Sequence, residues 1–126
     1  MVVYATILPN EEIEISDDIA SLYQYYKFFG NEMEIIQFIR KYNLVNILLD
    51  VVREIKRVFK NNVSFLELKL QHDPEENFSG IFIIIHTNLS PKEAVDLLDK
   101  LDEEWWLFID DEISNIVEII VRGNGI

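Results

Sequence analysis

The chain has 126 residues, a formal net charge of −12 and no cysteine. This length fits one domain over residues 1–126, large enough to bury a core without disulfide bonds. With 49% hydrophobic and 27% charged residues, the chain is too apolar to be disordered. The missing cysteines exclude disulfides, thiolate catalysis and Cys-ligated zinc. No apolar run approaches the roughly 18 residues that span a bilayer, and the first residues lack the basic start of a secretory signal. We therefore expect a cytoplasmic protein.

The acidic balance also bears on the class of partner. Binding to nucleic acid usually depends on Lys and Arg that neutralise phosphates, and this chain has 11 basic against 23 acidic residues. Such a charge repels a polyanion and attracts proteins with basic surfaces. The expected partner is another protein or a second copy of the chain, with no nucleic acid and no membrane.

The first third of the chain mixes strand and helix signals. Val2–Leu8 is rich in β-branched residues and predicts a strand. Glu11–Ile15 alternates polar and apolar residues, so a short hairpin through Pro9–Asn10 is an alternative. The stretch Ser16–Phe29 begins with a capping hydroxyl and two acids, which predicts a helix that stops at Gly30.

Aromatic residues crowd the end of this predicted helix, where five fall between Tyr23 and Phe29. At 100° per residue they point nearly all round the helix, whereas a surface helix needs one apolar stripe. The helix is therefore either central in the fold or covered by a partner. Tyrosine suits interfaces, which makes Tyr25 and Phe28 candidate interface residues.

The middle of the chain predicts further helices. Asn31 and Glu34 stand at the positions of a capping box, and an apolar face follows. Asn43 either breaks this helix or only interrupts it, and the helical period continues to Lys60. The basic residues of this second part are Arg53, Lys56, Arg57 and Lys60.

The last half predicts strands around one helix. Val63–Gln71 alternates as a half-buried strand, and Ile81–Thr87 is apolar on both faces, as in a central strand. The two strands should form an antiparallel hairpin. Ser90–Glu93 has the pattern of a capped helix start, and Ile116–Val121 predicts the last strand. The helix after Ser90 is expected to bury six apolar residues, Ala94, Leu97, Leu98, Leu101, Trp105 and Phe108.

These elements predict an α+β fold. We expect a three- or four-stranded antiparallel sheet with helices packed on one face. The element order is similar to the ferredoxin-like βαββαβ plan with an extended first helical region. A helical N-terminal half packed on a small C-terminal sheet is the alternative.

Two further features indicate protein contacts. Arg53, Arg57 and Lys60 share one helix face at spacings of four and three, and this basic stripe either receives an acidic partner or compensates the helix dipole. Trp106 lies about 100° from the buried Trp105, at the boundary of the apolar face. A tryptophan there is a candidate interface residue or packs against a neighbouring loop.

The residues needed for chemistry are sparse. No Gly-rich phosphate loop occurs, so no cofactor is expected. We assign no catalytic residue and no metal site. Weak metal candidates are His72 with Asp73. Asp99, Asp102 and Glu103 on the helix after Ser90 are also weak candidates, because calcium and magnesium favour carboxylate oxygens. The alternative to an interaction protein is a metal-dependent or His/carboxylate enzyme of unknown substrate.

One stretch of the C-terminal half also carries a resemblance. Asn88–Ala94 followed by Leu98–Trp106 has the pattern N-L-S-P-x-E-A…L-D-x-x-D-E-E-W-W. This pattern is similar to that of a family of small, uncharacterised prokaryotic proteins, over about residues 60–122. The resemblance implies no known activity, and it implies a two-gene, toxin–antitoxin-like setting. We therefore expect a non-enzymatic protein–protein interaction module, antitoxin-like or homo-oligomeric.

Overall fold

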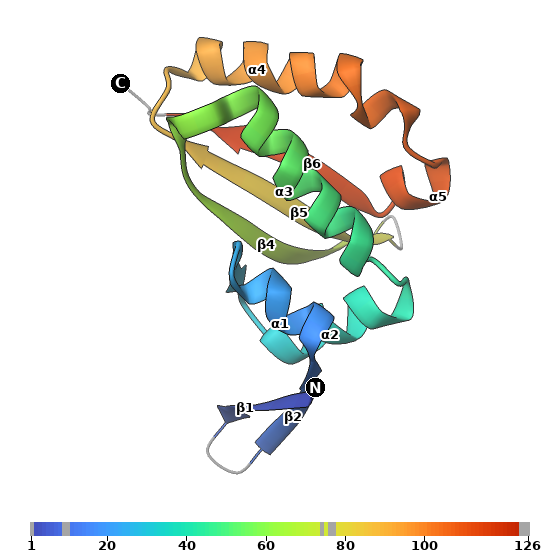
Figure 1. The fold of residues 1–126 in the computed structure, drawn as a ribbon. Helices are drawn as coiled ribbons and strands as arrows, with labels where there is room; N and C mark the ends of the chain where they lie inside the picture. The colour runs from blue at the N-terminus through green and yellow to red at the C-terminus, as the bar shows by residue number, and fades with distance from the viewer. Residues whose placement is uncertain (1, 9–10, 74, 76–77, 124–126) are drawn as a thin grey trace.

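The computed structural model describes residues 2–8, 11–73, 75 and 78–123 (Figure 1). Its first half contains β1 (Val2–Leu8), β2 (Glu11–Ser16), α1 (Asp17–Tyr23), β3 (Tyr26–Phe29), α2 (Glu32–Lys41) and α3 (Val45–Phe59). Its second half contains the 3-10 turn η1 (Lys60–Asn62), β4 (Val63–Asp73), β5 (Phe78–Thr87), α4 (Pro91–Glu104), the 3-10 turn η2 (Trp106–Phe108), α5 (Asp111–Ser114) and β6 (Val117–Arg122).

The main sheet has four strands in the order β3-β4-β5-β6. Strands β4 and β5 form the expected antiparallel hairpin, while β3 runs parallel to β4 and β6 runs parallel to β5. The α+β class is therefore confirmed, whereas a wholly antiparallel sheet is wrong. Helical connections make the difference, because they return the chain to the starting end of the sheet and so allow parallel neighbours. The parallel strands are also adjacent, unlike those of a split βαβ plan.

The strand β3 replaces the end of a predicted helix. Helix α1 stops at Tyr23, and the next two amides, of Gln24 and Tyr25, bond back to Ser21 and Leu22 in a turn. Four residues of the aromatic run then pair with β4. Aromatic residues favour strands, and side chains that point all round a helix alternate across a strand. The prediction of one helix over Ser16–Phe29 was wrong for this reason.

The N-terminal hairpin is present, but outside the main sheet. Strands β1 and β2 pair antiparallel in a sheet of their own, which confirms the hairpin alternative. The Pro9–Asn10 connection that the sequence indicates lies outside the described residues.

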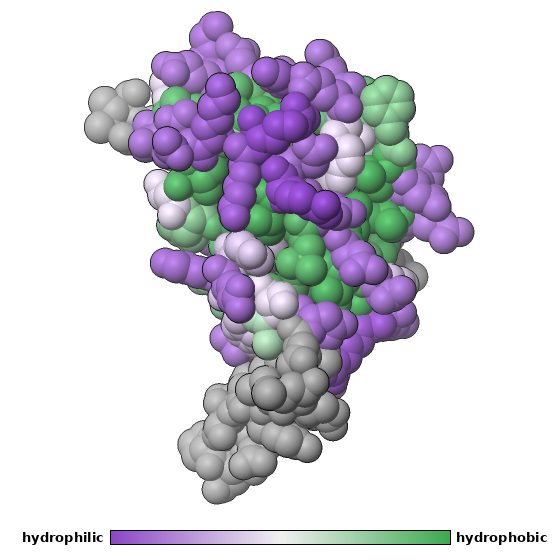
Figure 2. Space-filling view, in the orientation of Figure 1, coloured by the Kyte–Doolittle hydropathy of each residue, from purple (hydrophilic) through white to green (hydrophobic). Residues whose placement is uncertain are grey.

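The core lies between the helices and one face of the main sheet. Helices α3 and α4 run across this face (Figure 1). The buried side chains of α3 pack with alternate residues of β4, β5 and β6, such as Leu68, Ile83 and Ile119. Hydrophilic side chains cover much of the outer surface of the helices (Figure 2). The expectation of helices on one face is met, since the buried residues of every long helix join this one core.

Local signals in the sequence account for the helix ends. The Asn31 side chain accepts a hydrogen bond from the Glu34 amide at 3.2 Å, and Ser90 accepts one from the Glu93 amide at 3.3 Å. Asn43 has a φ of 53° and separates α2 from α3, so it breaks the helix instead of interrupting it. Asparagine tolerates this left-handed conformation better than most residues.

Helix α4 ends earlier than its apolar pattern indicates. It stops at Glu104, and η2 then turns Phe108 outward, where 80% of the residue is exposed. The prediction that Phe108 is buried was therefore wrong. In the part of the chain that the structure describes, no helix has both the length and the apolar character needed to cross a membrane.

Candidate functional site

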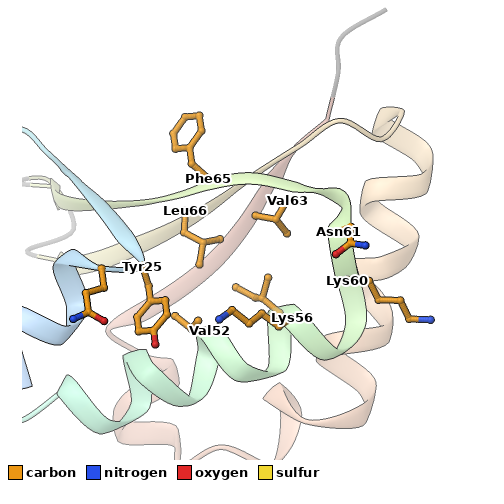
Figure 3. Close-up of a pocket in the computed structure, with 10 residues that line it drawn as sticks. Tyr25, Val52, Lys56, Lys60, Asn61, Val63, Phe65 and Leu66 are labelled. Atoms are coloured by element: carbon orange, nitrogen blue, oxygen red, sulfur yellow. The ribbon is translucent and has the colours of Figure 1, made fainter.

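The candidate site is a pocket of about 380 Å³ between α3 and the first residues of β4 (Figure 3). Its apolar lining comes from both elements and includes Val52, Ile55 and Leu66. Its polar lining comes from Gln24, Tyr25, Lys56, Lys60 and Asn61. No carboxylate is among the described residues that line it, although acidic residues outnumber basic ones by 23 to 11 in the whole chain. The pocket is thus a basic hollow on an acidic protein.

Lys56 and Tyr25 stand together at the pocket. The Lys56 side chain runs toward Tyr25 (Figure 3), and its Nζ lies 4.8 Å from the centre of the Tyr25 ring. A cation over an aromatic face is attracted by the ring, with no need for a carboxylate partner. Within the described part of the chain neither Lys56 nor Lys60 forms an ion pair, so both charges are available to a ligand.

Lys60 ends helix α3 at an uncommon backbone angle. Its φ of 54° lies in the region that favours glycine, and Asn62 then leads into β4. The Lys60 stem lines the pocket while its amine points outward (Figure 3). A lysine stem has four rotatable bonds, so this charge can reach a ligand at the rim.

The pocket also exposes a free stretch of sheet edge. Strand β4 begins at Val63, but β3 pairs with it only from Leu66 onward. In the part of the chain that the structure describes, residues 63–65 therefore have no strand beside them on the β3 side. Unpaired strand backbone is the feature that binds extended peptides by adding a strand.

The three residues of the basic stripe have different surroundings in the structure. Arg53 pairs with Asp50, and Arg57 donates to Glu54 at 2.5 Å and to Glu104 of α4 at 2.8 Å. Hydrogen bonds to these two carboxylates raise the pKa of Arg57, and the bond from Arg57 lowers the pKa of Glu104. Both arginines thus have acidic partners in the same molecule, whereas Lys60 lies at the pocket.

The aromatic candidates lie in different places. Tyr25 is 40% exposed at the pocket. Phe28 is half-buried on the helix side of the sheet and stacks on Tyr23, with ring centres 4.2 Å apart. Trp106 is half-buried in a separate hollow beside β6. The structure brings Tyr25 and Lys60 together and places the other two elsewhere.

The weak metal candidates are spread over two elements. His72 is exposed on β4, and its Nδ1 lies 2.6 Å from Ser79 Oγ, whereas Asp99, Asp102 and Glu103 lie on α4. The side chain of Asp73 lies outside the described residues. Among described residues, no group of three histidines and carboxylates could hold a metal ion.

Part of the pocket lacks a signal in the sequence. Lys56 belongs to the basic run of the sequence. What sets it apart from Arg53 and Arg57 is visible only in the structure, where both arginines pair with carboxylates. Gln24, Asn61 and Val63 were not singled out, because the free edge beside them depends on the short strand β3. Comparisons with protein-family models, curated proteins and solved structures give no match for this chain. The site is therefore interpreted from its own geometry.

Proposed function

We propose that the protein is a non-enzymatic protein–protein interaction module that binds an acidic, extended segment of a partner protein in the α3–β4 pocket. The observation that carries this proposal is the charge of the pocket. Two lysines that form no ion pair with a described residue line it and no described carboxylate does, on a chain with a net charge of −12. Opposite charge at an interface steers the encounter and selects the partner.

The rest of the lining supports an extended peptide as the ligand. Residues 63–65 of β4 offer backbone groups to an added strand. Side chains alternate along such a strand, so the set that faces α3 meets both the apolar residues Val52 and Ile55 and the charge of Lys56. The toxin–antitoxin-like setting that the resemblance implies would supply a second protein as the partner.

The test is a binding titration with a defined probe. The full chain is titrated against a short fluorescent peptide in which Asp and Glu alternate with Val and Leu, with a peptide bearing Lys in place of the acids as the control. We expect the acidic probe to bind and the basic probe not to bind. Affinity should fall as salt rises, because partly exposed charges are screened.

Charge reversal at the pocket then locates the binding site. We expect Lys56→Glu to weaken binding of the acidic probe by about fivefold or more, since it replaces an attraction with a repulsion. Lys92→Glu is the matched control, because Lys92 is an exposed lysine on α4, away from the pocket. Equal affinity for the acidic and basic probes, or equal weakening by the two variants, would refute the proposal.

A further inference from the structure

Among the described residues, no strand pairs with the outer edge of β6 in the main sheet. The Ile81 amide of β5 donates to the Ile116 carbonyl at 2.8 Å, which fixes the alternation along β6. The backbone groups of residues 118, 120 and 122 therefore face β5, and those of 117, 119 and 121 face outward. In the part of the chain that the structure describes, these outward groups have no backbone partner.

Apolar surface and a hollow flank this edge. A hollow of about 430 Å³ lies beside Val117 and Ile119, with Trp106 in its wall. Leu107 and Phe108 follow Trp106 and are 70% and 80% exposed, the highest values among the large hydrophobic residues that the structure describes. Figure 2 shows hydrophobic side chains open to solvent on the side where the chain passes from α4 to α5. Exposed apolar surface of this kind marks contact sites.

The charges of β6 are complementary to those of a second β6. Glu118 and Arg122 are both exposed on the helix-free face, and neither forms an ion pair with a described residue. In an antiparallel pair of β6 strands with the two-fold axis at Ile120, each Glu118 stands opposite Arg122 of the other copy. A two-fold interface requires this reciprocity.

The outward-facing backbone groups of β6 lie at the positions that this pairing requires. With the axis at Ile120, residue 119 of one copy meets residue 121 of the other, and both point outward, so they exchange hydrogen bonds. The 118–122 pairs are then non-hydrogen-bonded pairs, whose side chains lie closer together. An axis at Ile119 would place Ile120 opposite Glu118, and an axis at Val121 would place Ile120 opposite Arg122. Only the Ile120 axis, of these three, pairs opposite charges.

We propose that a second copy of this chain docks on the β6 edge, so that two β6 strands pair antiparallel about Ile120 and the two four-stranded sheets become one. The pairing satisfies the outward backbone groups and forms two Glu118–Arg122 ion pairs. Trp106 of η2 lies in the wall of the hollow beside this edge. The contact lies at the opposite edge of the sheet from β3 and is independent of the α3–β4 pocket.

Sedimentation equilibrium of the full chain provides the test. We expect a dimer, and we expect Glu118→Arg and Arg122→Glu each to raise its dissociation constant about tenfold or more, since each reversal places like charges opposite one another twice. The double variant Glu118→Arg/Arg122→Glu should restore the wild-type dissociation constant. Lys92→Glu, which makes the same charge change as Arg122→Glu on α4, should leave it unchanged.

A backbone variant tests the edge itself. Val121→Pro removes an amide that faces away from β5, so the monomer should keep its fold, checked by circular dichroism, and lose the dimer. A monomer at about 0.1 mM wild-type protein would overturn the proposal. A dimer that persists in both single reversals, or that the double variant fails to restore while folded, would also overturn it. None of these outcomes depends on whether the acidic probe binds.

Discussion

The buried hydroxyl of Tyr26 provides a direct test of the strand β3. Tyr26 is 3% exposed, and its hydroxyl donates to the Leu48 carbonyl of α3 at 2.6 Å. The bond ties β3 to a helix 22 residues further along the chain. Tyr26→Phe removes this bond and keeps the ring in the core. We expect the variant to be less stable than the wild-type protein.

The structure sets the size of the effect. A buried hydrogen bond of this type contributes about 1 kcal/mol net. The loss is held near this value because the Leu48 carbonyl keeps the helical bond from the amide four residues on. For a domain of this length the corresponding drop in Tm is about 3–5 °C.

Urea denaturation followed by circular dichroism measures the change. Tyr25→Phe is the matched control, because Tyr25 is 40% exposed and its hydroxyl has no hydrogen-bond partner among described residues. Its free energy of unfolding should stay within about 0.5 kcal/mol of the wild-type value. Equal stability of the two variants would show that Tyr26 does not lie in this buried strand.

Three other predictions concern stability. The pKa of Asp102 is raised, mainly by desolvation and to a smaller extent by repulsion from Asp99 and Glu103. The charged carboxylate is thus disfavoured in the folded protein, and Asp102→Asn should raise the free energy of unfolding at neutral pH, with the gain lost in acid, as urea titrations at both pH values would measure. A Cβ on Gly123 would lie 2.9 Å from the Leu89 carbonyl oxygen, so Gly123→Ala should lower the free energy of unfolding by about 1–3 kcal/mol in the same assay. Burial raises the pKa of Tyr26, so the wild-type protein should lose more stability than Tyr26→Phe as the pH rises above the usual tyrosine pKa, which denaturation in alkaline buffer would check.

Elements with local signals were predictable from the sequence. The caps at Asn31 and Ser90 need only residues within one helical turn, and the β4–β5 hairpin needs only alternation on both sides of a loop. Strand β3 was not predictable, because four residues pair in parallel with Leu66 to Lys69, about 40 positions away. The capped helix start at Ser16 favoured reading this segment with the 3.6-residue period of a helix instead of the two-residue period of a strand. Tertiary pairing decided the conformation of this segment.

The candidate surfaces share this origin in non-local pairing. Strand β3 has 4 residues and β4 has 11, so β3 covers only part of its neighbour and leaves the backbone of residues 63–65 open beside Lys56. At the other edge, β6 joins the sheet in parallel, and the hydrogen bond from Ile81 decides which of its backbone groups face outward. A register shifted by one residue would direct residues 118 and 120 outward and would end the 119–121 exchange on which the proposed dimer depends. The acidic composition led us to expect a protein partner, but composition could not indicate the two proposed contact surfaces, because these depend on the length of β3 and the register of β6.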